Sequence, residues 1–360
     1  MSDRWPVRPL KDVVGLQRGH DLPARVRGPG HVPVISSGGQ SGWHDKSIAD
    51  GPGVVLGRAT NLGKPYWVEG PYWPLNTTLY VRDFKGNEPR FIFHLFESLD
   101  LTRFDSGSVQ PMLNRNYIAN VPVYLPSLDE QRRIAGVLGA LDDLIDTNQS
   151  LASKAGDLAV ALAGTASGQV PLSTLSQLAN TQQFRPHGLI DHYSIPIFDE
   201  LRLPERIDGL AVKSGKLRIT EPSVLVSRLN PQTPRVWMAY TGDVPAATST
   251  EFVVLHANVR ATVEEVWALC ACDDFAAQMQ SRVTGTTGSH QRVDKAAIPT
   301  LLVADLATVD PAARTAIVAL VQEAQASLLA ARDATATRDA LLPLLLSRLV
   351  QVNPSKSVGV

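Results

Sequence analysis

The chain has 360 residues, of which 44% are hydrophobic and 19% are charged, so it can bury a substantial core and form two domains of ordinary size. Its formal net charge of −1 excludes a histone-like coating of nucleic acid, but a DNA-binding protein with locally basic surfaces is compatible with it. No apolar run approaches the roughly 18 residues that span a bilayer, and no apolar segment follows the basic amino terminus. We therefore expect a cytoplasmic protein with no membrane segment.

Short β-type segments interrupted by Gly, Pro and Asn fill most of the first half, which is typical of small irregular sheets. Extended runs are expected at residues 32–36, 54–56 and 77–81. A helix is expected over about residues 89–101, and a polar loop and a short strand that ends near Pro122 follow it. The segment of residues 1–126 is therefore predicted to be one α+β module.

A long helix over residues 127–166 is expected to close the first half. Ser127 is its expected N-cap, and Glu130, three residues later, is predicted to complete a capping box. Beyond it, residues recur in alternating steps of four and three, which is the spacing of a coiled-coil seam. The seam positions are Ile134, Leu138, Leu141, Ile145, Asn148, Ala152, Ala155, Ala159 and Leu162.

The second half repeats the first in diverged form. Pro9 and Leu10 match Pro171 and Leu172 at an offset of 162 residues. Extended runs are expected at residues 195–198, 223–229 and 252–255, with a helical stretch over about residues 263–282. The segment of residues 167–308 is therefore predicted to be a second α+β module that resembles the first.

A second long helix is expected over residues 309–350, before a short flexible tail of residues 351–360. Asp310 is its expected N-cap and Pro311 its first residue, and Pro343 is expected to kink or end it. The seam recurs at a constant offset of 183 residues, at Ile317, Val321, Ala324, Leu328, Ala331, Thr335, Arg338, Leu342 and Leu345.

Two helices with matching seams are predicted to pair with each other in antiparallel orientation, because a folded module separates them along the chain. The residues expected to hold the two helices together are Ile134, Leu138, Leu141, Ile145, Ile317, Val321 and Leu328. The seam is interrupted by Asn148, Thr335 and Arg338. Polar residues at such positions fix the register of the two helices but lower the stability of their pairing. A helix of about 35 residues rises roughly 50 Å. If the two predicted modules bind DNA, helices of this length can hold them one turn of the double helix apart. The periodicity alone also fits an alternative, in which the helices form a homodimeric coiled coil that has no role in DNA binding.

Basic residues outnumber acidic ones by seven to three between residues 202 and 238. The seven are Arg202, Arg206, Lys213, Lys216, Arg218, Arg228 and Arg235. A surface that faces DNA phosphates and an ordinary solvated face both fit this local excess of positive charge.

Three segments resemble motifs of the specificity subunits of type I DNA restriction-modification systems. Residues 125–135 read Leu-Pro-Ser-Leu-Asp-Glu-Gln-Arg-Arg-Ile-Ala and resemble the family's proline-led E-Q-x-x-I helix start. Residues 107–114 read Gly-Ser-Val-Gln-Pro-Met-Leu-Asn and resemble its G-S-x-Q-x-x-L-N loop, and residues 341–347 are similar to its closing L-L-P-x-L-L-S element. The second half departs from the pattern, since Ala313 and Arg314 stand where the first half has Glu130 and Gln131.

The resemblance implies an α+β fold in which two pseudo-repeated target recognition domains are separated by two long antiparallel coiled-coil helices. It implies a subunit that binds double-stranded DNA sequence-specifically at a bipartite site and docks two modification (methyltransferase) subunits, with restriction subunits where cleavage is supported. The two modules differ, so the site is expected to be asymmetric. Methyl donor and ATP are expected to bind the partner subunits, and no cofactor is expected in this chain.

Catalytic signatures are missing from the sequence. No Pro-Pro-aromatic motif of an exocyclic-amine methyltransferase, no phosphate-binding glycine loop and no H-E-x-x-H motif occurs. Cys270 and Cys272 lie in an apolar stretch without a nearby histidine and are expected to be core thiols, not metal ligands. We expect no catalytic residue, no metal site and no enzyme activity. Two alternatives remain, a coiled-coil protein-interaction scaffold without intrinsic DNA specificity and a self-sufficient DNA-modifying enzyme.

Base reading needs side chains with paired donors and acceptors, and phosphate contacts need positive charge. The candidates in the first module are Arg58, Lys64, Ser108, Gln110, Asn114 and Arg115. Those in the second module are Arg228, Arg282, Thr286, His290, Gln291 and Arg292. A group of aromatic residues is expected to anchor an irregular sheet, with contact to bases as the alternative: Trp43, Tyr66, Trp67, Tyr72 and Trp73.

Overall fold

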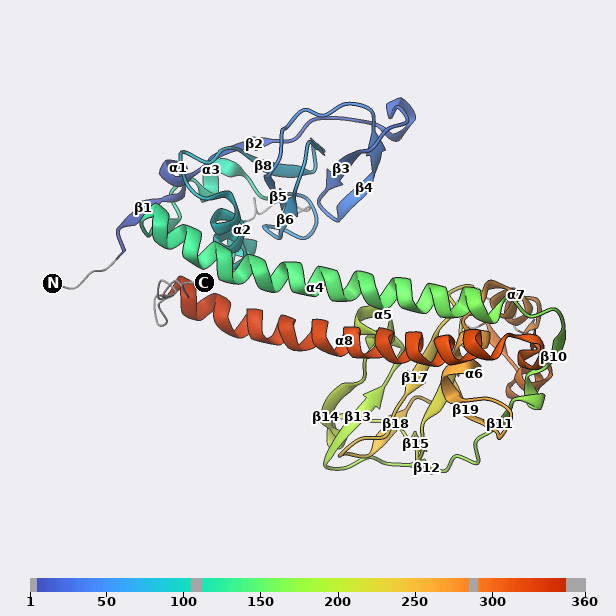
Figure 1. The fold of residues 1–360 in the computed structure, drawn as a ribbon. Coiled ribbons are helices and arrows are strands. Elements are labelled where there is room, and N and C mark those ends of the chain that lie inside the picture. Colours follow the sequence, from blue (N-terminus) through green and yellow to red (C-terminus); the bar gives the residue numbers. More distant parts are fainter. Residues whose placement is uncertain (1–4, 105–111, 285–290, 348–360) are drawn as a thin grey trace, which may run out of the picture. The chain divides into compact units, whose positions relative to one another are not determined.

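The computed structural model describes residues 5–104, 112–284 and 291–347. They divide into two compact units, one of residues 1–144 and 334–360 and one of residues 145–333. Both units mix helices with open sheets (Figure 1), so the predicted α+β class is confirmed. The two long helices are α4 (Leu128–Ala163) and α8 (Pro311–Leu346), and each contributes one segment to each unit.

The first unit contains a four-stranded antiparallel sheet in the order β2-β8-β5-β6, a smaller sheet in the order β4-β3-β7 and the pair β1-β9. Its other elements, in chain order, are β1 (Val7–Pro9), α1 (Leu10–Val13), β2 (Gly15–Arg18), η1 (Ala24–Val26), β3 (Val32–Ser36), β4 (Gly39–His44), β5 (Gly53–Gly57), β6 (Pro65–Val68), β7 (Trp73–Pro74), β8 (Thr78–Asp83), α2 (Pro89–Glu97), η2 (Thr102–Phe104), α3 (Arg115–Ile118) and β9 (Pro122–Tyr124). The strands expected at residues 32–36, 54–56 and 77–81 are therefore present as β3, β5 and β8.

Helix α2 forms the centre of the first unit's core. It begins with Pro89, which fits the first turn of a helix because its missing N–H needs no partner there. Phe91, Ile92 and Phe96 are buried against β5, β8 and the first turns of α4. The helix lies between the four-stranded sheet and α4 (Figure 1), and so it positions the sheet on the long helix.

The second unit repeats this arrangement. Its four-stranded antiparallel sheet has the order β11-β19-β16-β17, which corresponds strand for strand to β2-β8-β5-β6, and β10-β22 corresponds to β1-β9. A five-stranded sheet, β12-β15-β18-β13-β14, takes the place of the smaller sheet. Its other elements are β10 (Gln169–Pro171), η3 (Leu172–Thr174), β11 (Ser176–Leu178), β12 (Gln183–Phe184), β13 (Leu189–Tyr193), α5 (Ile195–Leu201), β14 (Glu205–Asp208), η4 (Gly209–Ala211), β15 (Lys216–Ile219), β16 (Ser223–Ser227), β17 (Val236–Ala239), β18 (Ala246–Thr248), β19 (Phe252–Ala257), α6 (Val263–Cys270), α7 (Asp273–Ser281), β20 (Val283–Thr284), β21 (Arg292–Val293), η5 (Lys295–Thr300), β22 (Leu302–Ala304) and η6 (Leu306–Thr308).

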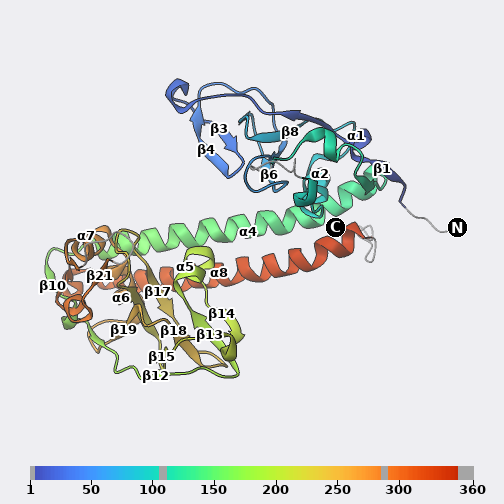
Figure 2. The ribbon, with the colours of Figure 1, turned by 180° about the vertical axis from the view of Figure 1, so that it is seen from behind.

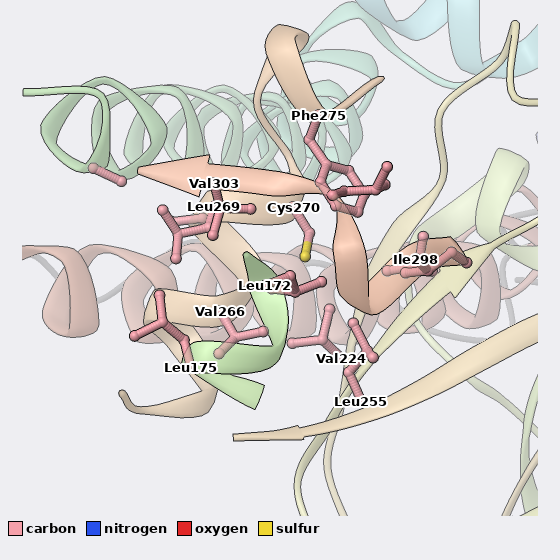
Figure 3. Packing of buried hydrophobic residues seen from close by; sticks show 14 of the residues in the cluster. Leu172, Leu175, Val224, Leu255, Val266, Leu269, Cys270, Phe275, Ile298 and Val303 are labelled. Carbon is pink, nitrogen blue, oxygen red and sulfur yellow. The ribbon is translucent and has the colours of Figure 1, made fainter. Parts of the chain in front are cut away.

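Helix α6 has the role in the second unit that α2 has in the first. Figure 3 shows its residues Val266, Leu269 and Cys270 among the buried side chains of the sheet and of the segments that flank it. The same core includes Ile317 and Val321 of α8. In each unit, therefore, one short helix is buried between a four-stranded sheet and a long helix.

The segments of α4 and α8 pack side by side within each unit and run in opposite directions (Figures 1 and 2). In the first unit, Leu138 shares a core with Leu345. In the second unit, Ala155 packs with Ala324, and Ala159 lies in the core that contains Val321. The predicted seam faces inward: none of its positions is exposed in either helix.

The first unit's helix contact includes ion pairs, whereas the second unit's is built from alanines. Arg338, a predicted interruption of the seam, donates to Asp142 of α4 at 3.1 Å, and Arg90 of α2 donates to the other oxygen of Asp142, also at 3.1 Å. In the second unit Ala152, Ala155 and Ala324 form the corresponding contact. Side chains that short allow the two backbones to approach closely.

The helix termini agree with prediction in part. Asp310 caps α8 as expected, since its carboxylate accepts the N–H groups of Ala312 and Ala313. At α4 the Ser127 hydroxyl accepts the N–H of Glu130 at 3.4 Å. The predicted reciprocal bond is wrong, because the carboxylate of Glu130 accepts from Arg133 instead.

Three predicted elements differ in the structure. Residues 195–198 are not a strand but begin helix α5, because Pro196 occupies its first turn, where a helix tolerates proline. The helical stretch of residues 263–282 is two helices, since Cys272 adopts an extended conformation between α6 and α7. Helix α8 continues past Pro343 to Leu346, because Leu345 is buried in the first unit's core and this burial offsets the lost hydrogen bond.

Candidate nucleic-acid interface

Strand β5, an inner strand of the first unit's four-stranded sheet, leads into an arginine whose backbone N–H and carbonyl are both hydrogen-bonded. Strand β5 ends at Gly57, which pairs with Thr78 of β8, and Arg58 follows. The N–H of Arg58 donates to the carbonyl of Thr77 at 3.0 Å, and its own carbonyl accepts from the N–H of Leu113 at 2.8 Å. The Arg58 side chain therefore starts from a fixed backbone position.

A second arginine reaches the same place from the neighbouring edge of the sheet. Nε of Arg18, the last residue of β2, donates to the carbonyl of Asn76 at 3.3 Å, and Nη1 of Arg58 donates to the same oxygen at 3.4 Å. Burial, and after it the charge of Arg18, holds the pKa of Arg58 below its usual value. We call Arg18, Arg58 and Asn76 the first corner.

Lys64 joins the first corner through the turn that follows β5. Its carbonyl accepts the N–H of Gly57 at 3.0 Å. The turn needs a glycine at position 57, because a Cβ there would lie 2.1 Å from the carbonyl oxygen of Asn61. The ammonium of Lys64 is exposed and lies 5.9 Å from the centre of the Tyr66 ring, so it is available to an anion in solvent.

The remaining first-module candidates differ in what their side chains do. Asn114 caps α3 by accepting the N–H of Asn116, which is a structural role. Arg115 is exposed and donates to the carbonyl of Leu16 in β2 at 3.4 Å, so it extends the basic surface along β2. Ser108 and Gln110 lie outside the described residues.

The second unit has an arginine at the equivalent place. Strand β16 ends at Ser227, which pairs with Phe252, and Arg228 follows. The N–H of Arg228 donates to the carbonyl of Glu251, and its carbonyl accepts from the N–H of Val293, both at 3.0 Å. These two bonds are the counterparts of those that Arg58 makes with Thr77 and Leu113.

An acidic side chain occupies this second corner, which we define as Arg228, Glu251 and Arg292. Glu251 accepts from Nε and Nη2 of Arg292 at 3.0 and 2.9 Å and lies 3.6 Å from Nε of Arg228. The hydrogen bonds from Arg292 hold the pKa of Glu251 below its usual value. Gln291 is beside them, since its carbonyl accepts the N–H of Asn230 at 2.9 Å.

Arg282 does not contact the second corner. It is exposed, and its Nη1 donates to the hydroxyl of Thr300 at 2.6 Å in η5. Thr286 and His290 lie outside the described residues. Of the second-module candidates, Arg228, Gln291 and Arg292 are therefore brought together.

Several positive charges of residues 202–238 are neutralised by acidic residues from outside that segment. Arg206 pairs with Asp191 and Asp243, and Arg235 pairs with Asp199. Their partners are contributed by tertiary folding, so counting charges along the segment overstated its basic character.

Lys216 and Arg218, two of the seven basic residues expected from the sequence, lie on strand β15 of the second unit's five-stranded sheet. Lys216 is 9% exposed and donates to Ser214, and burial lowers its pKa. On the neighbouring part of the sheet, burial and then the charge of Lys216 lower the pKa of His192 to about 4. Arg218 stacks on the ring of Phe184, so this face also carries positive charge.

The aromatic residues of the first module divide between core and surface. Tyr72 is fully buried, as expected of a sheet anchor, whereas Trp43 is 54% exposed. Tyr66, Trp67 and Trp73 are half-buried. Trp43 is thus the aromatic side chain of this group with most area available for contact.

The part of the chain that the structure describes contains no group of three metal-ligating side chains. Cys270 is buried in the second unit's core, and burial raises its pKa. Among the same residues, no helix is both long enough and apolar enough to cross a bilayer.

Comparison with known proteins identifies related chains. Residues 2–154 match the family model of the type I restriction modification DNA specificity domain. Over 144 residues the chain is 24% identical to the specificity subunit of type I restriction enzyme EcoprrI from Escherichia coli, which covers 38% of this chain and 36% of that protein. The match thus spans about a third of the relative's length.

A solved structure shares the fold. The crystal structure of the S subunit of a type-I restriction-modification system from M. genitalium superposes with a TM-score of 0.66. The superposition covers 96% of this chain and 97% of that one at 15% identity.

Proposed function

We propose that the chain is the DNA-reading, non-catalytic specificity subunit of a type I restriction-modification complex, because residues 2–154 match that family's DNA specificity domain and the chain shares the fold of a solved S subunit. It binds double-stranded DNA at an asymmetric bipartite site, one half per unit. It positions two modification subunits, and restriction subunits where present, on that DNA in the cytoplasm. Methyl donor and ATP bind those partners, and this chain needs no cofactor.

The observation that carries the proposal is the repetition of one scaffold with two different chemistries. In each unit an arginine directly follows an inner strand of the four-stranded sheet, β5 or β16, and is held by two equivalent backbone bonds: Arg58 in one unit and Arg228 in the other. Arginine can contact phosphate or read guanine bidentately. Different surroundings at equivalent positions favour unlike half-sites, and hence an asymmetric target.

The chain is proposed to act only together with its partners, because its sequence lacks the Pro-Pro-aromatic motif of an exocyclic-amine methyltransferase. Phosphate contacts supply affinity and register, and a few side chains on base edges supply sequence information. The paired helices α4 and α8 are proposed to act as the spacer that fixes the distance between half-sites, through Leu141, Ile145, Val321 and Leu328.

The test uses the chain purified with the methyltransferase subunits of its own source. Mapping of modified adenines in the source genome gives the target, and binding is then measured on duplexes with the intact target and with each half scrambled. We expect tight binding to the intact site, a loss for either scrambled half, and no methyl transfer by the chain alone. Equal affinity for all duplexes at moderate salt would contradict the proposal and favour a protein-binding scaffold.

A further inference from the structure

The first corner holds two positive charges close together, and no carboxylate of the described residues pairs with either. Arg18 and Arg58 donate to the same carbonyl oxygen, that of Asn76. Neither forms an ion pair with a carboxylate of residues 5–104, 112–284 or 291–347. The neighbouring carboxylate, Asp21, accepts from the side-chain amide of Asn76 at 2.9 Å instead.

Two guanidinium groups that share one acceptor repel each other, and a carbonyl oxygen carries too little charge to compensate. An anion between them relieves the repulsion, and guanidinium groups bind phosphate oxygens through strong, charge-assisted hydrogen bonds. A guanine edge is neutral and offers two acceptors to one arginine. The pairing of two arginines therefore favours a phosphate over a base.

The backbone of the first corner is rigid enough to hold such a site. Arg58 is fixed by its bonds to Thr77 and Leu113, and the hydroxyl of Ser37 accepts the N–H of Arg58 at 3.2 Å. Arg18 is paired with Leu79 in the same sheet. Because both side chains start from paired strands, little backbone order is lost when an anion binds.

The second corner shows what happens when a carboxylate is built into the same place. Glu251 stands where the first unit has Thr77, as the acceptor of the arginine N–H. Its carboxylate binds Arg292 and lies 3.6 Å from Arg228. The positive charge of the second corner is thus already compensated within the protein.

We propose that Arg18 and Arg58 clamp one phosphate of the DNA backbone, and that Glu251 prevents the second corner from doing the same. The clamp rests on the proposed function, since it assigns a role in DNA binding to one site of a DNA reader. It fixes the first unit's register on DNA without reading a base. The exchange of Thr77 for Glu251 makes the two units grip DNA unequally.

The test measures affinity against salt for the chain in complex with its methyltransferase partners, on a target duplex and a scrambled duplex. We expect R18Q and R58Q each to weaken binding to both duplexes by the same factor. Each is also expected to reduce the slope of the logarithm of the binding constant against the logarithm of the salt concentration by about one, the value for one phosphate contact. The double variant should lose little more than either single one, because both arginines hold one phosphate. Arg332, exposed on α8 and paired with Asp333, provides the control R332Q, which should leave the salt slope unchanged.

The charge-conserving variant R58K and the variant E251Q sharpen the test. R58K should keep the wild-type slope, and E251Q should make it steeper by up to about one counterion. An unchanged slope in R18Q and R58Q, or a loss confined to the target duplex, overturns the clamp. An unchanged slope in E251Q overturns the role of Glu251. If the wild-type complex binds both duplexes equally, the proposed function is wrong. The salt slopes of R18Q and R58Q still test the phosphate clamp in that case. Amide exchange of β5 in each variant shows whether a loss comes from unfolding.

Discussion

The two long helices begin with different residues that connect to equivalent places. In α4, the Gln131 side chain is buried; its oxygen accepts the N–H of Glu88 at 2.9 Å, and its amide donates to Asn87 at 2.9 Å and to the carbonyl of Pro126 at 3.0 Å. In α8, Arg314 stands at the matching position and donates to both oxygens of Glu265, at 2.5 and 2.9 Å. Glu88 precedes α2 and Glu265 lies in the first turn of α6.

Both contacts fasten the short core helix of a unit to the start of a long helix. The difference teaches that the Glu-Gln pair of the first half is not needed for this connection, since an arginine and a glutamate replace it in the second. The physical cost of losing each differs, however. Removal of the Gln131 side chain leaves neutral hydrogen-bonding groups without a partner. Removal of the Arg314 side chain leaves the charged carboxylate of Glu265, a residue that is only 2% exposed, without its cation.

The largest effect is expected from R314A. Removing one partner of a buried ion pair leaves an uncompensated charge and lowers the local stability by about 3 kcal/mol. The population of the open, exchange-competent form of α6 should therefore rise roughly 100-fold. Amide hydrogen exchange should show this increase in α6 and not in α2. The control R332A removes an exposed arginine of the same helix and should leave α6 unchanged. Equal exchange in R314A and wild type would show that the pair does not fasten α6.

A smaller effect in the other unit is expected from Q131A. The N–H of Glu88 and the carbonyl of Pro126 lose their partner, and a buried group left unsatisfied costs about 1–2 kcal/mol. Exchange should rise roughly tenfold in α2, while α6 keeps its protection. Gln149 is exposed on the same helix, so Q149A is the matched control. A rise in α6 alone would reject the equivalence of the two contacts.

Sequence reasoning was most successful where one local pattern decides the structure. The seam of α4 and α8 and the N-cap Asp310 follow from spacing and from residue type. It was wrong at Pro196, where a β-branched pattern outweighed the fit of proline to a first helical turn. It also failed at the break between α6 and α7, because Cys272 carries no sequence signal for a helix end.

The candidate site shows a different limit. Arg58 and Arg228 are candidates because of their residue type, but their equivalence follows from backbone bonds to residues that lie far along the chain, such as Leu113 and Val293. Arg18 was missed, since nothing near it in sequence distinguishes it. Which charges are compensated depends on such distant neighbours. The internal repeat between the two halves of the chain is the sequence feature that relates the two corners, if the halves are aligned residue by residue.

The smallest effect concerns pH, and it separates the two contacts by their chemistry. Burial raises the pKa of Glu265, but the hydrogen bonds from Arg314 and Thr262 outweigh it and hold the pKa below 4.5. A depressed carboxyl pKa gives stability that is present above the unfolded value, near 4.5, and is lost as pH falls through the folded value. In R314A the buried, unpaired Glu265 takes up a proton more readily, so the difference in α6 exchange between R314A and wild type should shrink as pH falls past 4.5. The difference in α2 exchange between Q131A and wild type should stay constant over the same range, because no charge is involved, and a parallel change in both would reject the distinction between the ion pair and the amide.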